Sequence, residues 1–320
     1  MSIEPRPISD TSPFAISRSP FSIVKALFRA IRPHQAAKNL FVYAALIFTG
    51  DLFHATEFFR VTAAFLLFSL AAGSIYILND LLDVEADRHH PKKCKRPIAS
   101  GALPLPLARI ALVILMGGSL LASATLSLKF GIVVAAYLIL QIAYCFSLKH
   151  IVLLDVFTIA IGFVLRAVAG GVVIDKHISH WLLLCTLQLA LFLGFGKRRQ
   201  ELVLLGENAG RHRAILQEYS IAFIDHIIVV VSAVTIVCYS VYSVDSESAA
   251  AHPHLWITVP IVIYSVCRYL YLVYQKGEGG APEDVLKQDR SMQVSILVWI
   301  VTALLLFMLD SPMRNFLGLQ

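Results

Sequence analysis

Nine long apolar runs constrain the fold of this 320-residue chain. They cover residues 36–50, 58–80, 104–125, 129–148, 151–174, 180–196, 222–244, 254–275 and 292–310. A helix that crosses a bilayer needs about 20 mostly apolar residues, so each run predicts a membrane-spanning helix. The first run is short, and an amphipathic lead from Phe21 to Arg32 extends it. Only 15% of the residues are charged, whereas soluble domains carry about 25%. We therefore predict an all-α, polytopic membrane protein with about nine transmembrane helices.

The basic residues distinguish the two sides of this predicted domain. If successive spans alternate in direction, 21 Lys and Arg residues lie on the side of the N-terminus and four on the other side. Cytoplasmic loops carry such an excess, so we expect a cytoplasmic N-terminus in the plasma (inner) membrane. Residues 1–20 are polar and rich in Pro and Ser, which predicts a flexible cytoplasmic tail before a single membrane domain at 21–320. The net charge of +6 is then explained without a nucleic-acid partner.

An acidic motif lies where the second run ends. Asp80, Asp83 and Asp87 are spaced i, i+3 and i+7, so one helical face carries all three, and Asn79 borders it. Carboxylates at a membrane-buried helix end repel each other and are costly there. A divalent cation offsets this repulsion, and oxygen ligands suit Mg²⁺, which also binds substrate phosphates. We predict that these four residues bind Mg²⁺ and that the aspartates are catalytic; the alternative is a solvated acidic helix end.

Basic residues follow the acidic motif directly. Arg88, Lys95 and Arg96 lie in the next loop. A diphosphate held by Mg²⁺ also needs Arg or Lys on its remaining oxygens, so this neighbourhood predicts a site for a phosphorylated substrate. Further candidate phosphate ligands lie on the same side of the predicted membrane domain: Lys38, Lys149, Lys197 and Arg198.

These motifs resemble the UbiA superfamily of intramembrane prenyltransferases. The resemblance rests on Asn79-Asp80-x-x-Asp83-x-x-x-Asp87, on Arg96-Pro97 after it, and on Tyr144-x-x-x-x-Lys149. It covers nearly the whole chain, from Arg32 to about the ninth run. It implies a UbiA-type helix bundle with a cytoplasm-facing active site, Mg²⁺ as the cofactor, and Tyr144 as an additional substrate-binding residue.

A narrower resemblance points to one branch of this superfamily. Its segments are Arg32-Pro33-x-Gln35-x-x-Lys38-Asn39, Gly162 to Gly171, Gly196-Lys197-Arg198-x-x-Glu201-Leu202, Arg268-Tyr269 and Pro282-Glu283-Asp284-Val285. The branch is implied to transfer 5-phosphoribose from phosphoribosyl diphosphate to a polyprenyl (decaprenyl) phosphate, releasing diphosphate, for the arabinan of certain cell walls. By this resemblance Glu201 joins the expected substrate-binding residues. Arg199 is a departure, because Tyr is expected there.

Two arginines lie inside predicted spans. Arg166 and Arg268 are costly in a bilayer, and such residues are functional by default. We include Arg166 among the candidate substrate-binding residues. The alternative is that both arginines pair with acids such as Asp155 or Asp225.

The segment Lys197-Arg198-Arg199-Gln200-Glu201 separates two functional hypotheses. Aromatic prenyltransferases of the superfamily carry a second Asp-rich motif at this place. A cationic segment suits two phosphorylated substrates better, so we favour phosphoribosyl transfer over a polyprenyl diphosphate-dependent aromatic prenyltransferase of quinone biosynthesis. A transporter is a third hypothesis, but transport does not explain acids and bases gathered on one side. The sequence leaves open a homo-oligomer and the roles of Glu283, Asp284 and Asp289.

Overall fold

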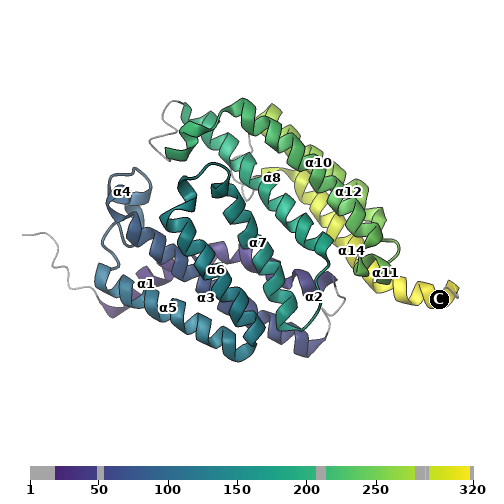
Figure 1. The fold of residues 1–320 in the computed structure, drawn as a ribbon, viewed down its shortest axis with the longest axis horizontal. Coiled ribbons are helices and arrows are strands. Elements are labelled where there is room, and N and C mark those ends of the chain that lie inside the picture. The colour runs from purple at the N-terminus through teal and green to yellow at the C-terminus, as the bar shows by residue number, and fades with distance from the viewer. Residues whose placement is uncertain (1–18, 49–53, 207–213, 278–284, 286–287, 318–320) are drawn as a thin grey trace, which may run out of the picture.

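The computed structural model describes residues 19–48, 54–206, 214–277, 285 and 288–317. Within these ranges every regular element is a helix, and no strand forms. Residues 1–18 of the predicted tail lie outside them, and Pro20, its last residue, already begins α1 (Pro20–Ile31). Figure 1 shows the helices gathered into one bundle, with the yellow C-terminal helix extending from it.

Eight segments of the described chain are long and apolar enough to cross a membrane. Many of their large apolar side chains point outward; on α5, for example, Val113 is 71% exposed and Leu121 is 70% exposed. Apolar surface of this extent needs lipid around it, so the chain is a multi-pass membrane protein. The eight are α3 (Ala55–Leu82), α5 (Leu105–Leu126), α6 (Leu128–Phe146), α7 (Leu154–Val173), α8 (His180–Leu205), α10 (Ile221–Asp245), α12 (Val259–Tyr271) with its extensions η7 (Leu255–Thr258) and η8 (Leu272–Lys276), and α14 (Arg290–Leu317).

The first predicted span differs from the other eight because its helix is broken. Arg32 ends α1 in the left-handed region (φ 56°), and the chain continues as the 3-10 helix η1 (Pro33–Tyr43) and the short helix α2 (Ala44–Phe48). Proline disfavours the α conformation in the residue before it and offers no amide hydrogen to an earlier turn. The Arg32-Pro33 pair therefore ends the amphipathic lead that the sequence suggested would extend this span.

The broken segment still crosses the bundle from end to end. At one end Arg32 binds Asp80, near the C-terminal end of α3. At the other end the carbonyl of Phe48 accepts a hydrogen bond of 3.0 Å from the hydroxyl of Ser248, which follows α10. Within the described residues, eight of the nine predicted spans are therefore helices long and apolar enough to cross a membrane, and the first is a broken segment.

Helix α7 forms the centre of the bundle. Figure 1 shows it between α3, α5 and α6 on one side and α8, α10 and α12 on the other. It also packs closely on η1, because a Cβ atom at Gly170 would lie only 1.8 Å from the carbonyl oxygen of Val42. A small residue is what permits two backbones to approach this closely. Short helices connect the passes: α4 (Val84–Arg88), η3 (Lys93–Lys95), η4 (Leu148–His150), η6 (Ala214–Glu218) and α11 (Glu247–Ala251).

Candidate active site

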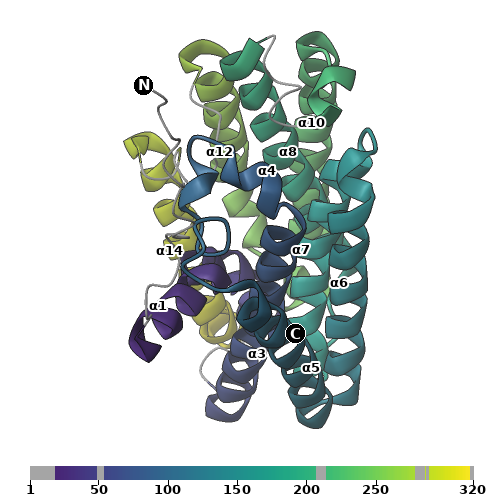
Figure 2. The ribbon, with the colours of Figure 1, turned by 90° about the vertical axis from the view of Figure 1, so that its left-hand side faces the viewer.

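The Asp-rich motif lies where α3 meets α4. Asp83 joins the two helices, since its amide donates to the carbonyl of Asn79 at 3.0 Å and its carbonyl accepts from the amide of Asp87 at 2.8 Å. Its backbone (φ −93°, ψ 9°) interrupts the helix without ending the i to i−4 hydrogen bonds. The helical spacing that the sequence predicts is therefore largely kept. Figure 2 shows α3 running toward α4, with the loop after α4 facing the viewer.

Asp80 is a buried carboxylate held by two arginines. Its side chain is only 2% exposed, and its Oδ1 accepts from Arg32 Nη2 at 2.5 Å and from Arg96 Nη1 at 3.1 Å. Its second oxygen, Oδ2, is buried and accepts no hydrogen bond from the described residues. A buried carboxylate oxygen without a donor is costly, so this atom is a candidate ligand for a cation.

Asp87 and Asp83 complete the acidic site. Asp87 accepts from Arg96 Nη1 at 2.6 Å, so a single guanidinium nitrogen connects Asp80 and Asp87. Asp83 is one-third exposed and accepts from Lys149 Nζ at 3.1 Å and from Asn79 Nδ2 at 3.1 Å. The structure thus brings together, from three separate parts of the sequence, the predicted residues Asn79, Asp80, Asp83, Asp87, Arg96 and Lys149.

The ligand atoms of this site are of the kind that Mg²⁺ prefers. Carboxylate and amide oxygens are hard ligands, and Mg²⁺ is commonly bound by one or two carboxylates together with substrate phosphates. Within the described ranges, no three His, Cys, Asp or Glu side chains form a group that could hold a metal ion by themselves. The Oδ2 atom of Asp80 and the partly exposed Asp83 fit a metal that a phosphate ligand helps to hold. Mg²⁺ binding by these carboxylates together with a substrate phosphate therefore stays a prediction.

Arg32 is a site residue that the sequence reasoning did not select. Its guanidinium binds Asp80 and lies 4.9 Å from the ring centroid of Tyr76, at a distance typical of a cation–π contact. The break before Pro33 turns the chain so that Arg32 lies beside the acidic motif. The Arg32-Pro33 pair was a visible signal, but a partner 48 residues away cannot be read from spacing.

A second charged cluster lies between α7 and α8. Arg198 Nε donates to Asp155 Oδ2 at 2.7 Å, and its Nη1 donates to Glu201 at 2.9 Å. The hydroxyl of Tyr219 donates to Asp155 Oδ1 at 2.7 Å and accepts from the amide of Leu153 at 2.6 Å. Burial, and then the hydrogen bond to Asp155, raise the pKa of Tyr219. Arg198 is only 4% exposed, so these internal acids neutralise a residue that we predicted as a phosphate ligand.

Two further arginines in the second half of the chain are also paired. Arg199 Nε donates to Asp225 at 2.6 Å. Arg268 binds both carboxylate oxygens of Asp289, at 3.2 and 2.6 Å, and this hydrogen bonding holds the pKa of Asp289 below its usual range. We considered that Arg166 and Arg268 pair with acids such as Asp155 or Asp225. These two acids instead bind Arg198 and Arg199. Glu283 and Asp284 lie outside the described residues.

Arg166 lies in a buried cage at the centre of the bundle. Its three nitrogens donate to Asn39 Oδ1 at 2.7 Å, to the carbonyl of Gly162 at 2.7 Å and to the Tyr137 hydroxyl at 3.1 Å. Its guanidinium carbon also lies 4.9 to 5.3 Å from the ring centroids of Phe68, Tyr137 and Phe163. With 6% exposure, this arginine connects η1, α6 and α7.

The remaining predicted residues lie on five different elements. Lys38 is half-buried on η1, and Tyr144 is half-buried on α6, close enough to Arg198 for an electrostatic interaction. Lys95 on η3 and Lys197 on α8 are exposed. Arg88 is exposed on α4 and binds a glutamate one turn earlier at 2.7 Å, so its observed pair is local.

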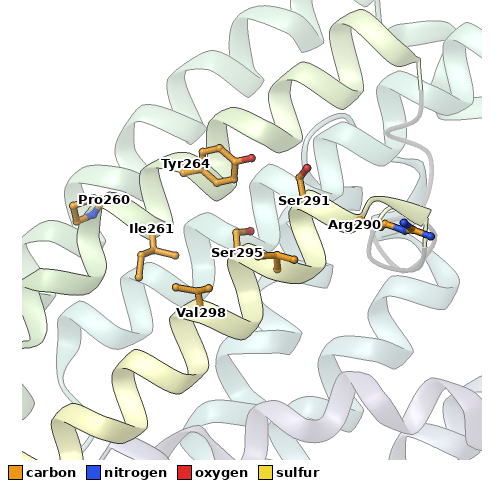
Figure 3. Close-up of a pocket in the computed structure, with 8 residues that line it drawn as sticks. Pro260, Ile261, Tyr264, Arg290, Ser291, Ser295 and Val298 are labelled. Atoms are coloured by element: carbon orange, nitrogen blue, oxygen red, sulfur yellow. The ribbon is translucent and has the colours of Figure 1, made fainter.

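A groove between α12 and α14 is separate from the acidic site. It has a volume of about 540 Å³ and opens on an outer face of the two helices. Figure 3 shows its lining, in which apolar side chains predominate and none of the predicted site residues takes part. The lining residues are Pro260, Ile261, Tyr264, Arg290, Ser291, Val294, Ser295 and Val298.

Comparison with known proteins places the chain in a family. Residues 39–201 match the UbiA prenyltransferase family. The chain is 36% identical to the decaprenyl-phosphate phosphoribosyltransferase of Mycolicibacterium smegmatis, over 88% of this chain and 92% of that protein. It is 33% identical to the enzyme of the same name from Corynebacterium glutamicum, over 88% and 86% of the two chains.

Solved structures show the same fold. A UbiA homolog from Archaeoglobus fulgidus bound to GPP and Mg²⁺ superposes with a TM-score of 0.67 at 16% identity, over 88% of this chain and 99% of that one. Sequence and fold agree over most of the length of both chains. The chain therefore belongs to the UbiA prenyltransferase family.

Proposed function

We propose that this protein transfers 5-phosphoribose from phosphoribosyl diphosphate to a polyprenyl phosphate such as decaprenyl phosphate. The observation that carries the proposal is the ion-paired site at one end of the bundle, where Asp80, Asp83 and Asp87 alternate with Arg32, Arg96 and Lys149. Such a site offers oxygen ligands to a metal and donors to phosphate oxygens within one small region. The names of the mycobacterial and corynebacterial relatives support the same activity.

The reaction requires little acid–base catalysis from the protein. The bond between ribose C1 and the diphosphate oxygen breaks, and diphosphate leaves with the electron pair. A bond then forms between C1 and an oxygen of the lipid phosphate. That phosphate is an anion near neutral pH, so no general base is required. The site must stabilise the leaving group and align the two substrates, which are the main sources of rate in such transfers.

The residues divide this work by their chemistry. A bound Mg²⁺ ion would neutralise charge on the departing diphosphate, and Asp80, Asp83 and Asp87, with Asn79, are the residues that would hold it. The guanidinium of Arg96, with Arg32 and Lys149, would bind the remaining diphosphate oxygens. For the 5-phosphate and the lipid phosphate we retain the half-buried or exposed cations Lys38, Lys95 and Lys197.

The location of the site fits a lipid substrate. Apolar helix faces surround a charged end, so a polyprenyl tail stays in the bilayer while its phosphate reaches the charged residues. The excess of basic residues at this end supports a cytoplasmic site in the plasma (inner) membrane. The product would then feed the synthesis of arabinan precursors for the cell wall.

The test is a transfer assay with the full-length protein in lipid nanodiscs. Labelled phosphoribosyl diphosphate and decaprenyl phosphate are incubated with and without Mg²⁺, and labelled lipid is counted. We expect Mg²⁺-dependent product, and a loss of about 100-fold or more in Asp80→Asn and Asp83→Asn, as for other groups that stabilise developing charge. Asp175→Asn is the matched control, because Asp175 binds Lys129 at 2.6 Å at the opposite end of the bundle and should keep full activity.

The same assay separates the competing functions. Product from a polyprenyl diphosphate and 4-hydroxybenzoate, with none from phosphoribosyl diphosphate, would establish an aromatic prenyltransferase. Movement of a labelled solute into proteoliposomes without chemical conversion would indicate a transporter. Undiminished activity in Asp80→Asn or Asp83→Asn would contradict the site assignment.

A further inference from the structure

The aspartates of the acidic site are already neutralised by bases of the same chain. Asp80 accepts from Arg32 and Arg96, Asp87 accepts from Arg96, and Asp83 accepts from Lys149. Three carboxylates thus meet three bases at hydrogen-bonding distances of 2.5 to 3.1 Å. A fourth base, Lys93, has its Nζ 3.9 Å from Asp87 Oδ1. A divalent cation that approaches this site alone therefore meets no net negative charge and must compete with the bound bases for oxygen atoms.

A metal–diphosphate ligand meets different conditions. Its phosphate oxygens are strong acceptors for guanidinium and ammonium groups, and its metal seeks carboxylate oxygens. An internal ion pair whose base can move can then be replaced by two interactions, one from base to phosphate and one from carboxylate to metal. The charges stay balanced through the exchange, so neither the bases nor the acids are left buried without a partner.

Arg96 and Lys149 are better suited to this exchange than Arg32. The guanidinium of Arg32 is held both by Asp80 and by the ring of Tyr76. Arg96 follows the short helix η3 in extended conformation, with a 25% exposed side chain, and both of its ion pairs use the same nitrogen. Lys149 lies on η4, and it binds Asp83, the most exposed of the three aspartates. The buried Oδ2 of Asp80, which no described residue donates to, remains available to a metal throughout.

We propose that Arg96 and Lys149 exchange partners between the aspartates and a bound diphosphate, so that the site binds a divalent cation tightly only together with a diphosphate-bearing ligand. This inference rests on the proposed function for its choice of ligand and deepens it. The metal and the diphosphate then enter as one unit, and their binding is positively coupled. Coupling between two ligands is reciprocal and typically amounts to about 5- to 150-fold in affinity.

The test measures binding and needs no turnover. Mn²⁺, which accepts the same oxygen ligands, is titrated into the full-length protein in nanodiscs and followed by its electron paramagnetic resonance signal. A metal buffer sets the concentration of free Mn²⁺, and the titration is made with and without inorganic diphosphate. We expect diphosphate to tighten Mn²⁺ binding by about tenfold or more, within the usual range of coupling. In Arg96→Gln, Mn²⁺ alone should bind about tenfold more tightly than to the wild type, and the effect of diphosphate should shrink.

Matched variants separate this effect from damage to the fold. Lys149→Gln, which removes the base bound to Asp83, should also bind Mn²⁺ alone more tightly and respond less to diphosphate. Arg96→Lys, which keeps the charge, should bind Mn²⁺ like the wild type. Lys129→Gln breaks an exposed ion pair at the opposite end and should change nothing. Equal Mn²⁺ affinity with and without diphosphate would overturn the exchange, and so would unchanged or weaker Mn²⁺ binding in both Arg96→Gln and Lys149→Gln. The proposed function fails separately, through absence of transfer in the activity assay.

Discussion

The cage around Arg166 gives a sharp prediction about a residue that is costly inside a membrane. We consider Arg166→Met, which keeps an unbranched side chain of similar length and removes the guanidinium. The change deletes three hydrogen bonds and three contacts with aromatic rings. It also leaves the buried Asn39 without a donor to its amide oxygen. We therefore expect Arg166→Met mainly to lower the stability of the folded protein.

The magnitude follows from the same contacts. Hydrogen bonds inside membrane proteins contribute about 0.6 kcal/mol each on average. Cation–π contacts contribute about 0.5 kcal/mol or more each. Together the six interactions give about 3 kcal/mol, which corresponds to a fall of roughly 6 °C in Tm at about 2 °C per kcal/mol for a large chain. Arg166→Lys should recover little of this, because an ammonium cannot reproduce three donors in a planar fork.

The assay combines thermal unfolding in detergent with kinetics below the transition. We expect Arg166→Met to unfold at lower temperature while the KM for phosphoribosyl diphosphate stays near the wild-type value. Asn39→Ala should have a similar but smaller effect, since it removes one of the three hydrogen bonds of the cage. An Arg166→Met protein with unchanged Tm and a raised KM would refute this reasoning and support the prediction that Arg166 binds substrate.

Three further predictions concern other parts of the bundle. Gly170→Ala should lower Tm strongly, because its Cβ would lie 1.8 Å from the carbonyl oxygen of Val42; thermal unfolding against Gly117→Ala, which has open space around it, is the check. Asp289 has a pKa below its usual value, so its ion pair should stabilise the fold above pH 4 and lose that effect as the pH falls further; Asp289→Asn should flatten this acid limb of a Tm–pH profile. Val298→Phe should fill part of the groove between α12 and α14 and leave transfer activity unchanged, and a loss in the transfer assay would connect that groove to the reaction.

The parts of the structure that were predictable are those in which local sequence sets the outcome. The length of each apolar run is enough to predict a membrane pass, and eight of the nine runs form helices long and apolar enough for one in the part of the chain that the structure describes. The spacing of Asp80, Asp83 and Asp87 holds because the i to i−4 hydrogen bonds continue through Asp83. The break at Arg32 was a matter of local chemistry as well, since Pro33 follows it, but the apolar pattern alone did not reveal it.

The pairing of buried charges was less predictable. The sequence suggests that intramembrane arginines pair with acids such as Asp155 and Asp225, and both acids do bind an arginine. Which arginine they bind depends on how α7, α8 and α10 are rotated against each other, and a single sequence does not report that rotation. The partners are Arg198 and Arg199, from the segment that we had expected to bind phosphate.

This pairing changes the argument for phosphate handling. The segment after position 196 is cationic in sequence, but the buried Asp155, together with Glu201, neutralises Arg198, and Asp225 neutralises Arg199. The two arginines therefore contribute little net positive charge to a substrate, since a charge near its opposite has a weak field at longer range. The Asp-rich end differs, because its bases are partly exposed and their partners are acids that a metal can take over. We therefore propose that Arg96 and Lys149 bind the diphosphate, and that Arg198 and Arg199 serve the packing of the second half, where their charges are balanced by buried or half-buried acids.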